Sequence, residues 1–331
     1  MTITTRKPTG KVAPPLILLE GGEKAGKSWA AALLSASEKV GRTFWIDLGE
    51  GAADEYGAIP GVRYEVVEHD GTWNSLLTNV LEIRDIAKQA SENGEPPVVL
   101  VLDSMTQEWD LLKDWANSRA RKAEFNQKRL RADPNAEIDV SMNFWNDATT
   151  RHRQLMTKLM TFPGVVVMIA RGKETAAVDA NGRPIARKKD YSVEGQKGLA
   201  YDASAWVRLS REAPPLLVGL RSVHSGMQPG VDKPETLKDF SIEALVFDRL
   251  RYNPQDATTR DLAVPADPEL IREQALSKES TIESLKALWH VAKNADLHDE
   301  PITDAAGKAT TLKELIESRA ADLAPKRVAA S

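Results

Sequence analysis

The chain has 331 residues, of which 42% are hydrophobic and 28% charged, and its formal net charge at pH 7 is −4. These proportions indicate a globular protein with a substantial core, and the charge balance offers no overall basic surface for nucleic acid. The sequence contains no cysteine, which excludes disulfides, thiol catalysis and cysteine-bound metals.

Residues 1–13 lack the hydrophobic core of a signal peptide, so we expect a short flexible lead-in before the folded chain. No apolar run approaches the roughly 20 residues that a helix needs to cross a bilayer. We therefore expect a cytoplasmic protein without a membrane partner.

The stretch LILLEGGEKAGKSWAAALL, residues 16–34, passes from an apolar run through glycines into a helical pattern. Gly21, Gly26, Lys27 and Ser28 fill every fixed position of the phosphate-loop pattern G-x-x-x-x-G-K-S. In that pattern backbone amides surround an anion, the lysine reaches the terminal phosphates and the hydroxyl ligates Mg²⁺. A glycine-rich turn that matches by chance is the alternative, but the strand before and the helix after favour a nucleotide. The expected nucleotide-binding residues are Gly21, Gly22, Glu23, Lys24, Ala25, Gly26, Lys27, Ser28 and Trp29.

Apolar runs and helical patterns alternate along the chain as far as about residue 250. The apolar runs are short and continuous, as in strands of a sheet that is covered on both faces. This order predicts a doubly wound α/β domain with a mainly parallel sheet flanked by helices. The expected strands are 16–19, 43–46, 98–102, 165–169, 205–209 and 216–220, and the expected helices include 29–40, 73–89 and about 106–131.

Asp103 follows directly after the apolar run 98–102 in the segment PPVVLVLDSMT. The carboxyl end of a parallel strand lies at the edge of the sheet where such folds bind ligands. We therefore expect Asp103 and Ser28 to hold Mg²⁺ and its water shell. The alternative is an aspartate that only caps the following helix.

The carboxylate that would orient the attacking water is less obvious. Many phosphate-loop ATPases have a glutamate directly after the metal aspartate, but this chain has Ser104. Without such a group hydrolysis is slow, so another carboxylate is expected near the terminal phosphate. Glu50, in the loop after strand 43–46, is the first candidate, and Glu108, about one helical turn past Asp103, is its rival.

Four segments of the chain resemble, in the same order, the RecA-like recombinases. The phosphate loop has glycine, any residue and then glutamate; FWIDLGEGAADEY resembles the segment of their catalytic glutamate, with one residue inserted before Glu50. VVLVLDSMT resembles their aspartate–serine metal strand, and EGQKGLAYDASAWVRLSRE resembles a glycine-rich stretch before a strand that ends in arginines. The likeness spans about residues 14–225. Phage-encoded RecA-like ATPases with single-strand annealing activity carry a shortened core of this kind.

This resemblance implies a RecA-like P-loop NTPase fold over residues 14–255, with Mg²⁺-dependent hydrolysis of ATP and assembly into a homo-oligomer. It implies that Lys27, Glu50 and Asp103 are the catalytic residues and that Asp54 and Tyr56 lie near the adenine.

The chain departs from the recombinases after the fourth strand, where they have a glutamine that senses the γ-phosphate and this chain has Arg171. Arg171 is open to two roles, phosphate sensing and contact with nucleic acid.

Two segments are locally basic: residues 119–131 hold six basic residues against one acidic, and residues 171–197 hold seven against four. Each run alone is typical of a solvated face. In RecA-like proteins, however, the loops after the third and fourth strands contact single-stranded DNA, and basic side chains there neutralise phosphates. The expected DNA-contacting residues are Arg121, Lys122, Lys128, Arg129, Arg131, Arg171, Lys173, Arg187, Lys188 and Lys189.

The composition changes after residue 255, where prolines interrupt the chain and only helical patterns follow. We expect residues 256–331 to form a small helical appendage. Its net charge, 10 − 14 = −4, favours a protein partner or self-assembly over DNA.

Two functions are compatible with these patterns. The first is a RecA-like ATPase, stimulated by DNA, that binds single-stranded DNA in phage-type recombination, annealing or replication. The alternative is a P-loop ATPase switch that serves protein assembly or regulation with little DNA contact.

Overall fold

The computed structural model of the chain describes residues 7–178, 183–228, 231–257, 267–277, 280–295 and 297–323, with the side chains of 176–178, 184–190 and 294 outside this description. The chain divides into two compact units, residues 1–262 and 263–331. This division falls seven residues after the boundary expected at 255. Of the expected lead-in at 1–13, residues 1–6 lie outside the described part, and residues 7–13 form neither helix nor strand.

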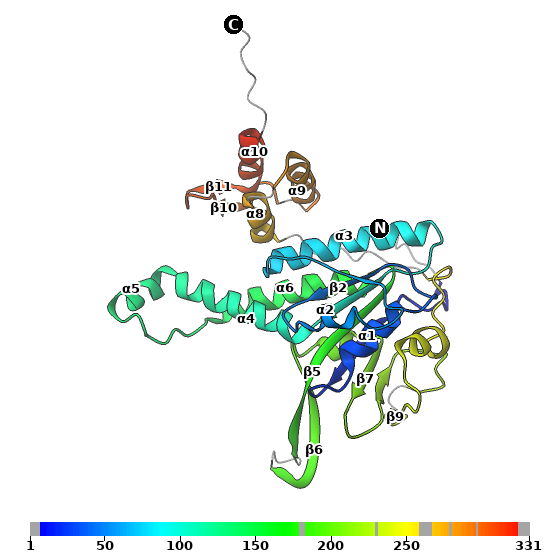
Figure 1. Cartoon of the computed structure of the whole chain (residues 1–331). Coiled ribbons are helices and arrows are strands. Elements are labelled where there is room, and N and C mark those ends of the chain that lie inside the picture. Colours follow the sequence, from blue (N-terminus) through cyan, green and yellow to red (C-terminus); the bar gives the residue numbers. More distant parts are fainter. Residues whose placement is uncertain are drawn as a thin grey trace. The chain divides into compact units, whose positions relative to one another are not determined.

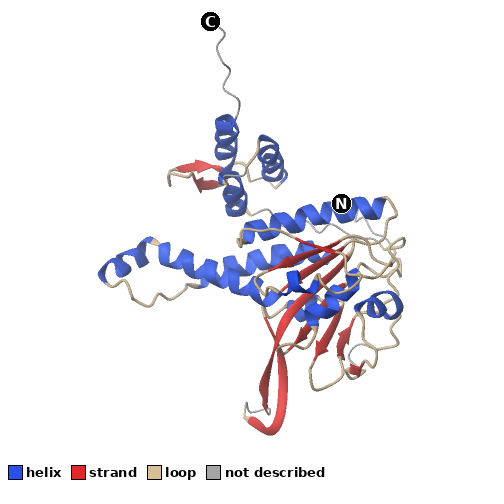
Figure 2. Ribbon diagram, in the orientation of Figure 1, coloured by secondary structure: helices blue, strands red, loops and turns tan. Residues whose placement is uncertain are grey.

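A mainly parallel sheet forms the centre of the first unit (Figure 2). Within the described residues it has nine strands in the order β3-β2-β4-β5-β1-β7-β8-β9, with β6 paired to β5. The strands from β3 to β7 in this order are parallel, whereas β6, β8 and β9 pair antiparallel with their neighbours. The strand bounds are β1 Leu16–Gly21, β2 Thr43–Asp47, β3 Tyr64–Val66, β4 Val99–Asp103, β5 Val165–Val178, β6 Pro184–Glu194, β7 Ala205–Leu209, β8 Leu216–Leu220 and β9 Glu235–Thr236.

Helices cover both faces of this sheet, and β1 and β4 are buried along their whole length. The helices α1, α2 and η1 share one core with Ile17 and Leu19 of β1, whereas α3, α4 and α6 pack together over the opposite face (Figure 1). No helix in the described part of the chain is long and apolar enough to cross a membrane. The helix bounds are α1 Lys27–Ser35, α2 Ala52–Tyr56, α3 Trp73–Glu92, α4 Met105–Lys122, α5 Glu124–Ala132, α6 Met142–Met160, α7 Leu199–Asp202 and the π-helix η1 Ala244–Arg249.

Two helices are shorter than the sequence predicts. α1 ends at Ser35 because Arg63 donates from Nε to the Ser35 carbonyl at 2.9 Å and from its amide to Ser35 Oγ at 3.1 Å. The expected helix 106–131 is two helices, α4 and α5. The break follows from Asn126, which is buried and donates from Nδ2 to the carbonyl of Ala120 at 2.8 Å, ending α4.

The segment 171–197, expected as a loop, is largely a β-hairpin. β5 continues past the sheet and pairs with β6, from Arg171 opposite Glu194 to Ala176 opposite Lys189. The hairpin projects from the body of the unit (Figure 1). Its described side chains are exposed or half-buried, and the sequence of the second strand, PIARKKDYSVE, contains no long apolar run.

The second unit has a core of its own, which includes Leu285, Leu312 and Leu315. The sequence predicts a helical appendage here, but the second unit also contains two strands, β10 and β11, which form an antiparallel pair. Asp304 makes the turn between them by accepting hydrogen bonds from the amides of Ala306 and Lys308, both at 2.9 Å. The elements are α8 Pro268–Leu276, α9 Ile282–Asn294, β10 Pro301–Thr303, β11 Ala309–Thr311 and α10 Leu312–Leu323.

Candidate active site

The phosphate loop joins the buried end of β1 to the first turn of α1. Gly21 lies so close to the backbone of Leu209 that any side chain at position 21 would collide with its carbonyl oxygen. Gly26 has a φ of +88°, a left-handed conformation that favours glycine, and it precedes α1 without a side-chain cap. The first amides of α1 are therefore left for another acceptor, as in helix N-termini that bind phosphate.

Lys27 lies across this loop. Its Nζ donates hydrogen bonds to the carbonyl oxygens of Gly21 at 2.9 Å and Gly22 at 2.8 Å. Burial lowers the pKa of Lys27, and the carboxylates of Asp103 and Glu50 oppose that shift. The ammonium group is thus held by neutral acceptors, which the charged oxygens of a phosphate would outcompete.

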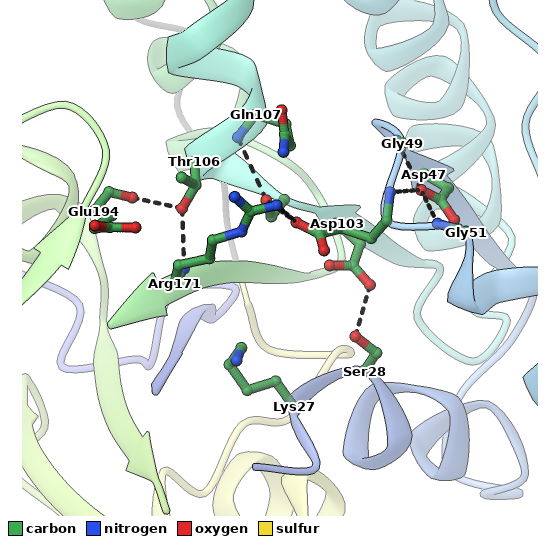
Figure 3. A network of polar contacts seen from close by, with 12 residues as sticks. Lys27, Ser28, Asp47, Gly49, Gly51, Asp103, Thr106, Gln107, Arg171 and Glu194 are labelled. Carbon is green, nitrogen blue, oxygen red and sulfur yellow. Dashed lines mark hydrogen bonds and ion pairs between the residues drawn. The ribbon is translucent and has the colours of Figure 1, made fainter. Parts of the chain in front are cut away.

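Asp103 ends β4 and faces the same loop. It is 1% exposed, and Oδ2 accepts a hydrogen bond from Ser28 Oγ at 2.8 Å (Figure 3). Burial raises the pKa of Asp103 to about 6. The hydrogen bond from Ser28 opposes this rise, and the nearby charges of Glu50 and Asp47 add to it.

The pair formed by Ser28 and Asp103 suits Mg²⁺. A hydroxyl and a carboxylate are hard oxygen donors, and Mg²⁺ is usually held by one or two such groups together with waters and phosphate oxygens. Among the described residues, no cluster of three or more His, Asp or Glu side chains is placed to hold a metal ion. The donor chemistry at Ser28 and Asp103 therefore fits an ion that is shared with the phosphates.

Glu50 is positioned by the turn that follows β2. Asp47 Oδ1 accepts hydrogen bonds from the amides of Gly49, Glu50 and Gly51 at 2.9, 2.8 and 3.2 Å, which folds the loop back toward the strand ends (Figure 3). The Glu50 carboxylate then accepts a hydrogen bond from Ser104 Oγ at 3.1 Å. This contact brings Glu50 beside the strand end that carries Asp103.

Arg171 also reaches Glu50, from β5. Its Nη2 lies 2.9 Å from Glu50 Oε1. Its amide donates to Thr106 Oγ1 at 2.9 Å, and that hydroxyl donates to the carbonyl of Glu194 at 2.6 Å. Thr106 therefore ties the base of the hairpin to the start of α4. The sequence analysis did not predict these contacts. The only indication of them in the sequence is that Arg171 directly follows the apolar run of its strand.

One cavity of about 820 Å³ is bordered by Lys27, Ser28, Glu50, Asp103 and Arg171. Tyr56 lines this cavity, and the Trp29 ring makes an edge-on contact with the Tyr56 ring, with ring centroids 5.6 Å apart. Trp29 itself is not part of the lining, and neither is Asp54, the other residue expected near the adenine. The other lining residues predicted from the sequence are Gly21, Gly22, Glu23, Lys24, Ala25, Gly26, Lys27, Ser28, Glu50, Asp103, Arg171 and Lys173.

Glu108, the rival to Glu50, does not face this cavity. It is fully buried, and its Oε2 lies 2.9 Å from Nδ1 of His152 on α6. Of these two candidates, Glu50 is therefore the one that lines the cavity.

The basic residues expected to contact DNA fall into two places. Arg171 and Lys173, at the base of the hairpin, line the cavity that also contains the phosphate loop. The residues of the first basic segment lie near the end of α4 and on α5, on an arm that projects from the body (Figure 1), and are exposed: Arg121, Lys122, Lys128, Arg129 and Arg131. Arg187, Lys188 and Lys189 lie on β6, and their side chains are outside the described residues.

A family model matches the part of the chain that holds this site. The model of the AAA_24 family, described as an AAA domain, matches residues 13–213. A search of curated proteins finds no match. Among solved structures, the chain is similar to one reported as a prototypical ATPase from the type III secretion system of pathogenic bacteria, at 12% identity and a TM-score of 0.39, over 95% of this chain and 83% of that chain.

Proposed function

Because the chain belongs to the AAA_24 family of P-loop NTPase domains, we propose that it binds ATP with Mg²⁺ at the phosphate loop and hydrolyses it. The observation that carries this proposal is the convergence of Lys27, Asp103 and Glu50 on one cavity. The three residues come from separate segments, namely the phosphate loop, the end of β4 and the loop after β2.

In the proposed nucleotide complex, the amides of the phosphate loop and the Lys27 ammonium bind the phosphates. Lys27 exchanges its bonds to Gly21 and Gly22 for charge-assisted bonds to phosphate oxygens, which are stronger. Ser28 and Asp103 hold Mg²⁺, which when bound neutralises charge on the phosphate oxygens.

Glu50 is the proposed general base. Its carboxylate orients a water molecule toward the terminal phosphate and accepts a proton from that water. Ser104 and Arg171 hold the carboxylate at the cavity by hydrogen bonds of 3.1 and 2.9 Å. A catalytic carboxylate that is already engaged by a guanidinium is consistent with slow turnover in the absence of a partner.

We propose single-stranded DNA as that partner, in phage-type recombination, annealing or replication by a homo-oligomer. Two features support it: the exposed basic side chains on α5, and the hairpin whose base residues Arg171 and Lys173 line the nucleotide cavity. A ligand on the hairpin would therefore act close to the site of hydrolysis. The second unit, with its own core and an acidic balance, is the proposed contact for a protein partner.

Steady-state ATPase assays with and without a single-stranded oligonucleotide test this function. We expect Mg²⁺-dependent turnover that rises when the oligonucleotide is added. The same slow turnover under both conditions would contradict DNA stimulation and favour the alternative, a nucleotide switch for protein assembly. Absence of ATP binding would contradict the whole proposal.

A further inference from the structure

A buried carboxylate lies directly before the phosphate loop and has no part in the mechanism above. Glu20 is 0% exposed. A charged group is costly to bury unless it is paired and hydrogen-bonded. Its partners are on β7: Arg208 Nε donates to Oε2 at 2.9 Å and Oε1 at 3.2 Å, and Trp206 Nε1 donates to Oε2 at 3.0 Å.

The sheet explains why these groups meet. Glu20 and Arg208 are directly opposite each other in the parallel pairing of β1 with β7. Trp206 is two residues before Arg208, so its side chain lies on the same face of the strand. The ion pair therefore fixes the end of β1, from which the phosphate loop leaves, to the end of β7.

The same ion pair touches the hairpin at two points. The Arg208 guanidinium lies over the ring of Tyr191 on β6, 4.5 Å from its centroid. On β5, Gly172 passes so close to Glu20 that a Cβ at position 172 would collide with the carboxylate. Only glycine allows this approach, so the base of the hairpin rests directly on the Glu20 side chain.

The surroundings leave room for this contact to change. A cavity of about 440 Å³ opens beside it and is lined by Glu20, Tyr191 and Arg208 together with phosphate-loop residues. Tyr191 is 43% exposed and the Arg208 side chain 17% exposed. A shift of the hairpin would thus move Tyr191 relative to Arg208, and any shift of Arg208 acts on Glu20 and the start of the phosphate loop.

We propose that Glu20 and Arg208 are positioning residues that couple the β5–β6 hairpin to the phosphate loop, so that the state of one changes the other. This inference deepens the proposed function, on which it rests, by naming a route between hairpin and nucleotide. Coupling between sites is reciprocal. Nucleotide bound at the phosphate loop must therefore alter the hairpin even when DNA is absent.

Hydrogen exchange of the full chain, with and without a non-hydrolysable ATP analogue and Mg²⁺, tests this coupling. In the wild type we expect the analogue to slow exchange in the phosphate loop and to change exchange in the hairpin by at least ~5-fold, the lower range of allosteric coupling. In Glu20→Gln/Arg208→Gln, which removes both charges together, and in Tyr191→Leu, which removes the ring, the hairpin response should fall below ~2-fold. The phosphate-loop response should remain in both.

Two control variants test whether the loss of the hairpin response could come from a general disturbance of the structure. Tyr191→Phe keeps the ring over Arg208 and should keep the hairpin response. Arg42→Gln/Glu65→Gln removes an ion pair of 2.9 Å between the residue before β2 and the neighbouring β3, and should also keep it.

The outcomes separate the inference from the function on which it rests. If the analogue protects the phosphate loop but the wild-type hairpin does not respond, or if both test variants respond like the wild type, the coupling is wrong and nucleotide binding stands. If the phosphate loop itself gains no protection, nucleotide binding at this site is wrong and the coupling falls with it. A failure of DNA to stimulate turnover would leave the nucleotide-induced hairpin response as a valid test.

Discussion

Arg171 and Glu50 form an ion pair of 2.9 Å across the nucleotide cavity, although 121 residues separate them in the sequence. The Glu50 side chain is 28% exposed and that of Arg171 46% exposed, so the pair is accessible to a nucleotide and to solvent. The expected catalytic carboxylate is thus held by a residue from the base of the hairpin. This relationship makes the identity of the catalytic carboxylate the first point to test.

Glu50→Gln should lower ATP turnover by roughly 10²–10⁴-fold, because a positioned general base contributes about that much to the rate. The amide keeps the size of the side chain and can still hydrogen-bond Ser104 and Arg171, but it cannot accept the proton. ATP should still bind, since Lys27, Ser28 and Asp103 are unchanged. Single-turnover hydrolysis and equilibrium binding of a fluorescent ATP analogue measure the two effects.

Glu108→Gln provides the contrast. Glu108 is fully buried against His152, so this change should lower the free energy of unfolding by about 1–3 kcal/mol. Turnover per folded molecule should change little. The assignment of Glu50 would be overturned if Glu108→Gln stopped hydrolysis while Glu50→Gln left it intact.

The parts of the site that the sequence predicts are those set by local structure. The phosphate loop is continuous in the chain, and Asp103 directly follows an apolar strand, so residue spacing alone places both at the carboxyl edge of a parallel sheet. The strands 205–209 and 216–220 match β7 and β8, because short apolar runs between turns leave little choice of bounds.

The contacts that could not be predicted depend on which strands are neighbours. Glu20 meets Arg208 only because β7 pairs with β1, and Arg171 reaches Glu50 only because β5 lies between β1 and β4. A single sequence does not give that order. The hairpin also escapes prediction, since its described side chains are exposed or half-buried. The end of α4 at Lys122 escapes it as well, because Asn126 and Gln127 of the next helix donate hydrogen bonds to carbonyls in the last turn of α4.

Lys27→Ala should lower ATP affinity by roughly 10–100-fold and bring turnover near the detection limit, because it removes the charge-assisted bonds to the phosphates. The fold should remain, since Lys27 contacts only two loop carbonyls by hydrogen bond in the described structure. Isothermal titration with Mg²⁺–ATP and thermal unfolding check these two expectations. Lys88→Ala, which removes the same charge from the exposed face of α3, is the control and should bind ATP as the wild type does.

Replacement of Lys128 and Arg129 by glutamine should weaken binding of single-stranded DNA and reduce its salt dependence. Removing one phosphate contact should lower the slope of log affinity against log salt by about 0.7. Fluorescence anisotropy at several salt concentrations measures the slope. The same change at Lys286 and Lys313, in the second unit, should leave it unaltered. An unchanged slope in the Lys128/Arg129 variant would remove α5 from the DNA-contacting surface.

The last prediction concerns the cost of keeping Asp103 buried at the proposed metal position. Its folded-state pKa of about 6 lies above its ordinary value of 3.8, so the folded protein binds the proton more tightly than the unfolded chain does. The stability from this group is therefore fully present below pH ~4 and is lost as the pH rises toward ~6, by up to roughly 3 kcal/mol.

Asp103→Asn should remove this pH dependence, because an amide does not ionise, and the nucleotide-free variant should be more stable than the wild type above pH 6. The same change should weaken Mg²⁺-dependent hydrolysis far more than Mg²⁺-free nucleotide binding, since the amide loses the charge that attracts the ion. Urea unfolding between pH 4 and pH 8, in the absence of nucleotide and Mg²⁺, measures the first effect, and ATPase titration with Mg²⁺ the second. A variant that is less stable at pH 8, or that needs no more Mg²⁺ than the wild type, would show that Asp103 serves the fold and does not hold the metal, since Ser104 is the N-cap of α4. The expected result is a variant that is more stable but inactive. The buried negative charge of Asp103 destabilises the metal-free protein, and a bound cation would offset that charge.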